Sequence, residues 1–464
     1  MKIWALAAAA AAILAAIVSQ YTLCSHLLLS RLGICWLGSS GVAVAPARNL
    51  SLLWMAPFFS PSGYGSEALS YVQSLRGGEI SKIKIVQHGD LEDYQYWNGL
   101  PRETKKLLLR MNGEEIQLRE SIVICHSEPG AWFPPLFSTV PCPPGDYREP
   151  LYVIGRTMFE TDRLSLEHVK RCNAMDEVWV PSQFNVETFA SSGVLRSKLV
   201  KVPQAVDTHF FDPGRVTPLK LSTAGRVLGR GSEDSEFLAR SSFVFLSIFK
   251  WETRKGWDVL LQAFLEEFSA DDDVALYVLT SSYHSDGHFG DKVLEFTRAM
   301  GLEEHSSGWP RVYIRDAHVP QVDLPRLYKA ANAFVLPSRG EGWGRPHVEA
   351  MAMELPVIAT NWSGSTEFMT PDNSYGLAVE RLSEIKEGAF KGHKWAEPSV
   401  SELRSLMRRV FTYRDEAGAK GVQARKDMVT KYSPEKIADV IIKELLRMQK
   451  QRDNRMNDNW SVAL

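Results

Sequence analysis

The sequence predicts an α/β protein with two Rossmann-like domains that face a cleft, preceded by an N-terminal hydrophobic segment. Two observations lead to this fold class. A pattern of apolar strand, polar loop and amphipathic helix begins near residue 50 and starts afresh near residue 243. The length of 464 residues also exceeds what a single core usually supports, so two domains with additions are expected.

The N-terminal segment is apolar and uncharged from Ile3 to Ser19, about 17 residues, which is the lower limit for a membrane span. No small-residue cleavage site follows closely, so an uncleaved signal-anchor is favoured over a cleaved signal peptide. Lys2 favours a cytosolic N-terminus, although Arg31 weakens that argument. We expect residues 1–47 to be a signal-anchor or signal peptide with a stem, touching the membrane through residues 3–19.

This segment also predicts a location. A single-pass protein of the Golgi or ER membrane, with its catalytic part in the lumen, is the first expectation, and a secreted protein is the second. A cytosolic hairpin or organellar targeting remains a further alternative.

The first domain is expected at residues 48–213. Leu50 to Ala56 are typical of a buried strand, and a loop with Gly63 and Gly65 precedes a helix from about Glu67. Further strands are expected at 80–90, 121–126, within 151–164 and from 176, the last followed by a helix that Ser182 caps.

Residues 214–240 are rich in Gly, Ser and charge without apolar periodicity, which predicts a linker or surface insert. The second domain is expected at 241–432. Its strands are predicted at 243–249, 274–283, 311–320, near 333–337 and at 355–360, with an amphipathic helix from about Gly256. Residues 433–464 are expected to form a final helix, begun by Ser433 and Pro434, and a polar tail.

The composition excludes some classes of function. With 53 basic and 55 acidic residues the net charge is −2, so no nucleic-acid partner is expected. The five cysteines form no CxxC pair and are predicted to be buried or unpaired thiols rather than a disulfide scaffold. No zinc-type spacing of His, Cys and carboxylates occurs, so no protein-bound metal is expected.

A basic loop follows the strand at 243–249. Lys250, Arg254 and Lys255 place three cations within six residues at a strand exit. Such a run is often only a solvated loop. Because ligands of open α/β sheets bind beyond the carboxyl ends of the strands, a diphosphate held by these cations is the favoured interpretation.

The stretch SRGEGWGRPHVEAMA, residues 338–352, places glycines before a helix that Pro346 begins. Gly342 and Gly344 would let backbone N–H groups approach a ligand, and the helix from Arg345 directs its positive end there. Glu341 and Glu349 would each accept the hydroxyls of a sugar or ribose. Taken alone, a glycine turn with a surface glutamate is equally compatible.

Strand exits in the first domain add weaker candidates. His126 follows the apolar strand SIVIC, where a hydrogen-bonded structural histidine and a functional one are about equally expected. Glu128, Arg156 and Glu160 lie at similar exits and are candidates for the side of the cleft that binds the acceptor.

Three segments together resemble the family-4 retaining glycosyltransferases of GT-B fold: RKGWDVLLQAF, VPQAVDTHFF and FVLPSRGEGWGRPHVEAMAMELPVIATNWSGSTEF. The resemblance covers nearly everything after about Ala56. It implies a nucleotide-diphosphate-sugar donor as co-substrate, bound mainly by the second domain, with no obligatory cofactor. It also implies that the final helix crosses back to the first domain.

The resemblance assigns roles to single residues. Lys255 and its neighbours match pyrophosphate-binding residues, and Glu341 matches the glutamate that contacts the donor sugar. Glu349 matches the ribose-binding glutamate. The loop from Gly63 to Gly65 matches the glycine loop near the phosphates, and His126 a histidine near the reacting sugar. The candidate catalytic residues are therefore His126, Glu341 and Lys255.

The chain departs from the family pattern in one place that matters. Phe249 and Lys250 stand where Gly-Arg is common, so either Lys250 or Arg254 takes the role of that arginine.

The function implied is transfer of a sugar, with retention, from a UDP- or GDP-sugar to a hydroxyl of a glycan, glycolipid or glycoprotein in the secretory pathway. A carbohydrate or lipid-linked acceptor is the expected partner. The alternative is a non-catalytic scaffold of the same fold that binds nucleotide sugars or glycans. A nicotinamide dehydrogenase is disfavoured because GYGSEA after the first strand does not fit G-x-G-x-x-G.

Overall fold

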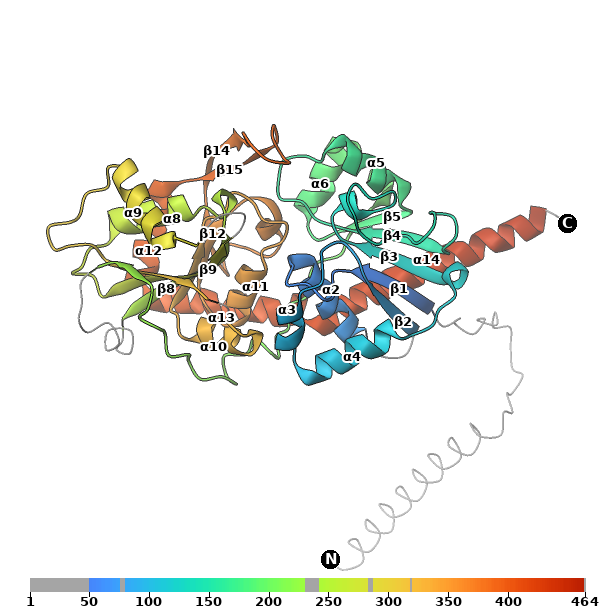
Figure 1. The fold of residues 1–464 in the computed structure, drawn as a ribbon, viewed down its shortest axis with the longest axis horizontal. Coiled ribbons are helices and arrows are strands. Elements are labelled where there is room, and N and C mark those ends of the chain that lie inside the picture. The colour runs from blue at the N-terminus through green and yellow to red at the C-terminus, as the bar shows by residue number, and fades with distance from the viewer. Residues whose placement is uncertain (1–49, 76–79, 230–241, 283–286, 318, 463–464) are drawn as a thin grey trace, which may run out of the picture. The chain divides into compact units, whose positions relative to one another are not determined.

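The computed structural model describes residues 50–75, 80–229, 242–282, 287–317 and 319–462, with side chains to residue 451. The predicted membrane segment at residues 3–19 lies outside these ranges. Within them, none of the helices combines the length and the hydropathy that a membrane span requires. Residues 49–464 form one compact unit that contains both sheets (Figure 1).

The first sheet has six strands in the order β2-β1-β3-β4-β5-β6, all parallel. Parallel neighbours need crossover connections, and helices on both faces leave the central strands apolar throughout. The strands are β1 (Leu50–Ala56), β2 (Ile80–Gln87), β3 (Ser121–His126), β4 (Tyr152–Arg156), β5 (Glu177–Val180) and β6 (Leu199–Lys201). The helices are α2 (Gly63–Ser74), α3 (Tyr94–Gly99), α4 (Arg102–Asn112), α5 (Leu166–Ala174) and α6 (Gln183–Ser192).

The second sheet has the order β13-β12-β11-β8-β9-β10-β7, with β7 antiparallel to β10. Its strands are β7 (Arg226–Leu228), β8 (Phe243–Trp251), β9 (Val274–Ser282), β10 (Arg311–Asp316), β11 (Ala333–Leu336), β12 (Val357–Thr360) and β13 (Tyr375–Leu377). Its helices are α8 (Trp257–Glu267), α9 (Phe289–Ala299), α10 (Leu324–Lys329), α11 (Arg345–Ala352), α12 (Val400–Thr412) and α13 (Arg414–Lys431). The two parallel sheets therefore match the predicted α/β class.

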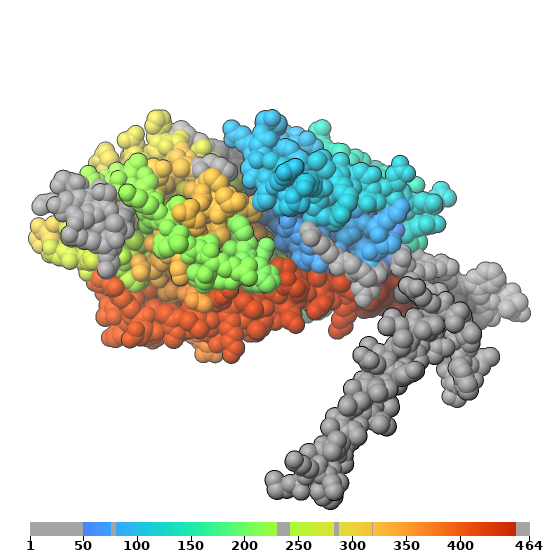
Figure 2. Space-filling model, turned by 90° about the horizontal axis from the view of Figure 1, so that it is seen from below, coloured from blue at the N-terminus to red at the C-terminus, as the bar shows by residue number. Residues whose placement is uncertain are grey.

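The C-terminal helix joins the two domains. α14 (Pro434–Val462) packs against α2 of the first domain. Both carboxylate oxygens of Glu177 on β5 accept from Arg447 Nη2, at 2.6 and 2.8 Å. Figure 2 shows the C-terminal helices, in red, as one strip along the face beneath both domains.

Several elements were not predicted. Helices α3 and α4 were not predicted, although α4 buries Leu107, Leu108 and Met111 on one face. The segment predicted as a linker contributes β7 as an edge strand. Residues 379–398 form a separate hairpin from β14 (Val379–Glu384) and β15 (Lys394–Pro398). We call residues 379–398 the clasp hairpin, because its tip contacts the first domain.

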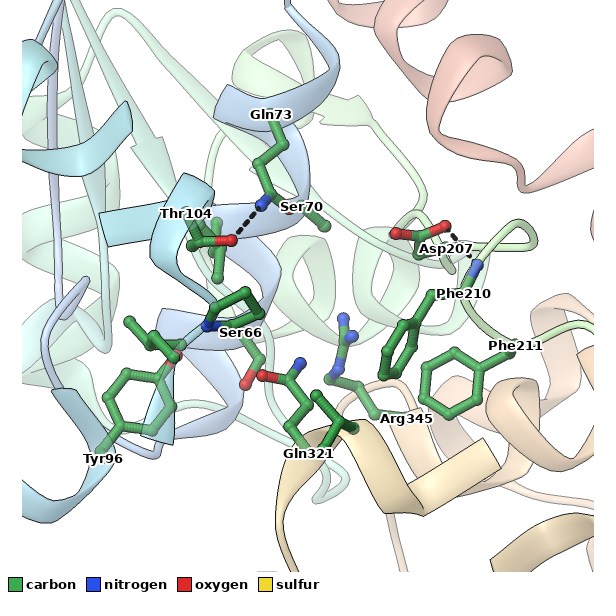
Figure 3. A pocket seen from close by; sticks show the side chains of 14 residues that line it. Ser66, Ser70, Gln73, Tyr96, Thr104, Asp207, Phe210, Phe211, Gln321 and Arg345 are labelled. Atoms are coloured by element: carbon green, nitrogen blue, oxygen red, sulfur yellow. Dashed lines mark hydrogen bonds between the residues drawn. The ribbon is translucent and has the colours of Figure 1, made fainter. Parts of the chain in front are cut away.

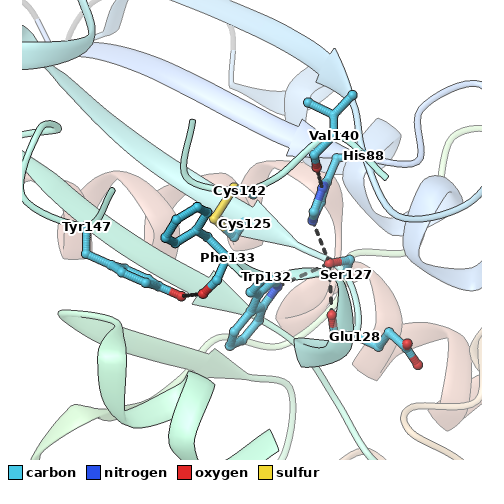
Figure 4. Close-up of a disulfide and its surroundings, with 9 residues drawn as sticks. All are labelled: His88, Cys125, Ser127, Glu128, Trp132, Phe133, Val140, Cys142 and Tyr147. Atoms are coloured by element: carbon cyan, nitrogen blue, oxygen red, sulfur yellow. Dashed lines mark hydrogen bonds between the residues drawn. A yellow bond between two sulfur atoms is a disulfide. The ribbon is translucent and has the colours of Figure 1, made fainter. Parts of the chain in front are cut away.

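The expectation for the cysteines is wrong in part. Cys125, the last but one residue of β3, forms a disulfide with Cys142 in the loop that follows (Figure 4). Cys172 is a buried free thiol, as predicted. A spacing of 17 residues carries no local signal, because only the fold of the 127–142 loop brings the two sulfurs together.

Candidate active site

The second sheet creates a crevice where its strand order reverses, between β8 and β11. The loops that leave these two strands are consequently neighbours. Gly256 makes the contact possible: its φ is +66°, and a Cβ there would lie 1.9 Å from the carbonyl oxygen of Pro337. Only glycine fits this position, and the close approach brings Lys255 beside Glu341.

A carboxylate and two cations meet in this crevice, and we call Glu341, Lys255 and Arg254 the cleft triad. Lys255 Nζ donates to Oε1 and Oε2 of Glu341 at 2.7 and 2.9 Å. Arg254 Nη1 donates to the carbonyl of Gly340 at 2.8 Å and lies 3.5 Å from Glu341 Oε2. Arg254 also pairs with Glu160 of the first domain at 3.4 Å. The triad of the second domain therefore also contacts the first domain.

The charges of the triad depend on one another. Burial alone would raise the pKa of Glu341, but Lys255 and Arg254 lower it to about 2. Burial and the adjacent Arg254 lower the pKa of Lys255, which Glu341 partly opposes. Glu341 is thus a carboxylate at neutral pH, suited to accept hydrogen bonds from hydroxyls.

A cleft of about 810 Å³ lies over the cleft triad. That volume suits a ligand of the size of a nucleotide sugar. Both domains line it, and it gathers most of the predicted donor-binding residues. They are Gly63, Lys250, Arg254, Lys255, Glu341, Gly342, Gly344 and Arg345, with Glu160 from the predicted acceptor side.

Two cleft-lining side chains escaped the sequence analysis. The indole N–H of Trp343 and the hydroxyl of Thr280 are buried and have no hydrogen-bond partner among the described residues. Buried polar groups are normally paired, so these donors are candidates to meet a ligand. The position of Trp343 between two glycines of the predicted loop was the available signal, whereas Thr280 carried none.

Glu349 lies one helical turn inside α11, beside the cleft rather than in its lining. Tyr328 donates to it at 3.0 Å, and Arg345 Nε lies 3.7 Å away. Burial nevertheless raises the pKa of Glu349. Its assignment to the ribose stays a prediction.

Arg345 lines a second pocket as well as the cleft. Figure 3 shows its guanidinium between Ser66 of α2, Gln321 and Phe210, in a pocket of about 110 Å³. Within the described part of the chain its Nη1 is buried without a hydrogen-bond partner. Arg345 can therefore turn toward an anion in the adjoining cleft without breaking a hydrogen bond of that nitrogen.

A second ion cluster lies inside the first domain, and we call Glu67, His126 and Arg156 the buried triad. All three are 0% exposed. Glu67 Oε2 pairs with His126 Nε2 at 3.0 Å, and Glu67 Oε1 accepts from Arg156 Nε at 2.9 Å. Arg156 and His126 lower the pKa of Glu67 to about 2 despite its burial.

The buried triad holds two of the predicted site residues inside the first domain, and their assignments stay predictions. His126 was expected at the reacting sugar and Arg156 at the acceptor, but neither reaches the cleft surface. The ring of Tyr64, which lines the cleft, packs edge-on against His126 at 5.9 Å. The reason is a buried partner: Glu67 lies within α2, at a position without a sequence signal, and binds both basic side chains inside the domain.

Two further residues differ from expectation. A Cβ at Gly65 would lie 2.3 Å from the carbonyl oxygen of Pro57. The lack of a side chain at Gly65 therefore lets the backbone of Pro57 pack closely, rather than a ligand. Glu128 is not in the lining of the cleft, and burial together with Asp90 and Glu160 raises its pKa. Figure 4 shows its carboxylate pointing away from the disulfide.

Comparison with known proteins agrees with this geometry. A family model described as "Glycosyl transferases group 1" matches residues 240–388, which include β8, the basic loop and the cleft triad. Residues 240–388, about a third of the chain, are therefore similar to the glycosyl transferases group 1 family.

Curated relatives match parts of the chain. Mannosylfructose-phosphate synthase of Agrobacterium fabrum is 28% identical over 226 residues, 46% of this chain and 45% of that protein. O-antigen chain mannosyltransferase B of Escherichia coli is 37% identical over 153 residues, 32% of this chain and 38% of that protein. The matched stretches thus span less than half the length of these two relatives.

A similar solved structure shows the fold. Alr3699/HepE of Anabaena, in complex with UDP and glucose, has a TM-score of 0.58 at 14% identity. The match covers 86% of this chain and 100% of that one. The described residues therefore have the GT-B arrangement of two Rossmann-like sheets.

Proposed function

We propose that the chain is a retaining glycosyltransferase that moves a hexose from a UDP- or GDP-sugar to a hydroxyl acceptor. The observation that carries the proposal is the cleft triad, in which two cations and a glutamate face an 810 Å³ cleft. The UDP and glucose bound by Alr3699/HepE support the donor class. A relative from Corynebacterium glutamicum that is named as a GDP-mannose-dependent mannosyltransferase, 25% identical over 244 residues, supports a GDP-sugar as the other candidate.

The residues divide the work as follows. Lys255 and Arg254, with the N-terminus of α11, stabilise the negative charge of the departing diphosphate without a metal. Glu341 accepts hydrogen bonds from the donor sugar, while Glu349 takes the ribose. On donor binding, Lys255 exchanges part of its contact with Glu341 for a phosphate oxygen.

Retention follows from the family resemblance. Because the resemblance implies retention, we propose substitution on the front face without a protein nucleophile. The leaving phosphate then helps to deprotonate the acceptor hydroxyl.

The acceptor is proposed to be a glycan, glycolipid or glycoprotein, and the setting the lumen of the Golgi or ER. Two observations support the setting: the apolar residues 3–19 and the Cys125–Cys142 disulfide. Disulfides persist in oxidising compartments and are rare in the cytosol.

Incubation of the purified full chain with a panel of UDP- and GDP-sugars tests the proposal. We expect slow release of nucleoside diphosphate from one donor, and loss of this release in Glu341→Ala. Binding of a nucleotide sugar without any turnover, with or without acceptors, would favour the non-catalytic scaffold instead.

A further inference from the structure

The tip of the clasp hairpin is bound to the first domain. Lys394 N donates to Asp162 Oδ1 at 2.6 Å, and Asp162 N donates back to the carbonyl of Lys394 at 3.0 Å. Phe390 packs edge-on against Phe159 at 4.9 Å. Figure 1 shows β14 and β15 beside α5 and α6 of the first domain. These contacts attach the hairpin to the segment that directly follows β4.

The base of the hairpin is bound to Arg339, two residues before Glu341. Ala396 N donates to the carbonyl of Arg339 at 2.9 Å. Arg339 Nε donates to Glu397 Oε2 of β15 at 3.0 Å. The side chain of Arg339 is only 8% exposed, so its position is set by these contacts rather than by solvent.

Arg339 in turn holds the basic loop. Its Nη1 donates to the carbonyl of Thr253 at 2.6 Å, and its backbone N donates to the carbonyl of Arg254 at 2.6 Å. Nη1 and Nη2 also reach the two carboxylate oxygens of Asp258 on α8 at 2.9 and 2.8 Å. Nη1 and Nη2 thus hold the residues around Lys255, while Nε holds the clasp hairpin.

The same first-domain segment also touches the cleft directly. Glu160 pairs with Arg254, and a Cβ at Gly340 would lie 2.4 Å from the carbonyl oxygen of Glu160. Residues 159–162 therefore contact the basic loop by two routes, one direct and one through the clasp hairpin and Arg339.

We propose that the clasp hairpin and Arg339 couple engagement of the first domain to the position of the diphosphate-binding loop, with Arg339 as a positioning residue. The effect of this coupling on catalysis rests on the proposed function, whereas the contacts that transmit it do not. A small misplacement of a charge that stabilises a leaving group costs up to ~100-fold in rate, so this device would make transfer depend on domain closure.

Amide hydrogen exchange tests the coupling independently of catalysis. In the full chain carrying Asp162→Ala and Phe390→Ser, we expect exchange at residues 253–256 to rise at least about fivefold, although both substitutions lie elsewhere. Leu382→Ser, on β14 and 44% exposed, is the matched control and should leave these amides unchanged. Unchanged exchange at 253–256, or a uniform rise across the second domain, would overturn the proposal.

Kinetics then tests the role of Arg339. Lysine keeps the charge but not the forked contacts, so Arg339→Lys should lose most of what Arg339→Met loses, ~10- to 100-fold in kcat/KM for the donor. Full rescue by lysine would contradict the positioning role. If the unaltered protein releases no nucleoside diphosphate, the proposed function fails, while the exchange experiment still decides the coupling.

Discussion

The buried triad and the cleft triad are chemically alike and differ in their surroundings. Each holds a glutamate between two basic side chains, and in each the pKa of that glutamate is lowered to about 2. Glu67 is 0% exposed within its domain, whereas Glu341 borders an 810 Å³ cleft. An ion cluster sealed from solvent serves the fold, and the same chemistry beside a cleft is available to a ligand.

The largest expected effect is on stability, in the buried triad. Glu67→Gln leaves Arg156 buried without its counter-charge, so the free energy of unfolding should fall by about 3–5 kcal/mol. Urea unfolding followed by circular dichroism measures this. A change below about 1 kcal/mol would mean that the buried triad is not structural.

The same substitution in the cleft triad should act on activity. Glu341→Gln should lower kcat/KM for the donor by ~10²–10³-fold, because under the proposed function the variant loses the carboxylate that accepts hydrogen bonds from the donor sugar. Its unfolding free energy should change by only about 1 kcal/mol, since Arg254 keeps Glu160 and Glu252 as partners. Equal losses of unfolding free energy in Glu67→Gln and Glu341→Gln would contradict the view that the buried triad stabilises the fold and the cleft triad binds a ligand.

Acid should remove the contribution of the buried triad to stability. A carboxyl whose folded-state pKa is about 2, against an ordinary 4.5, binds fewer protons folded than unfolded between these values. Its stabilisation is complete above pH 4.5 and is lost as the pH falls toward 2, by up to about 3 kcal/mol. The urea midpoint of the unaltered chain should therefore fall between pH 5.5 and pH 3, and this fall should be smaller in Glu67→Gln. An equal fall in both proteins would contradict the prediction.

The smallest expected effect is that of removing metal ions. Lys255 with Arg254 can supply the positive charge that a departing diphosphate needs. Donor turnover should be the same with and without EDTA. Loss of turnover that Mg²⁺ or Mn²⁺ restores would show that the leaving group needs a metal.

The sequence predicted what local patterns and neighbouring strand exits determine. Both sheets followed from the apolar periodicity, and the basic loop from its place after a strand. Glu341 contacts Lys255 because the strand order reverses between the strands that precede them. The roles of His126 and Arg156 could not be judged, because they depend on Glu67, which is 59 and 89 residues away in sequence. The disulfide and the clasp hairpin likewise depend on tertiary contacts between segments without a repeating pattern.

Calorimetric titration of UDP and GDP into the full chain tests the central claim, that the cleft triad binds a diphosphate. We expect one of the two nucleotides to bind. Lys255→Met should weaken its binding about 10- to 100-fold, the cost of one hydrogen bond to a charged group. Lys329→Met, which removes an exposed lysine on α10, should leave the Kd unchanged. Equal affinity in Lys255→Met and the unaltered chain, or no binding of either nucleotide, would contradict it.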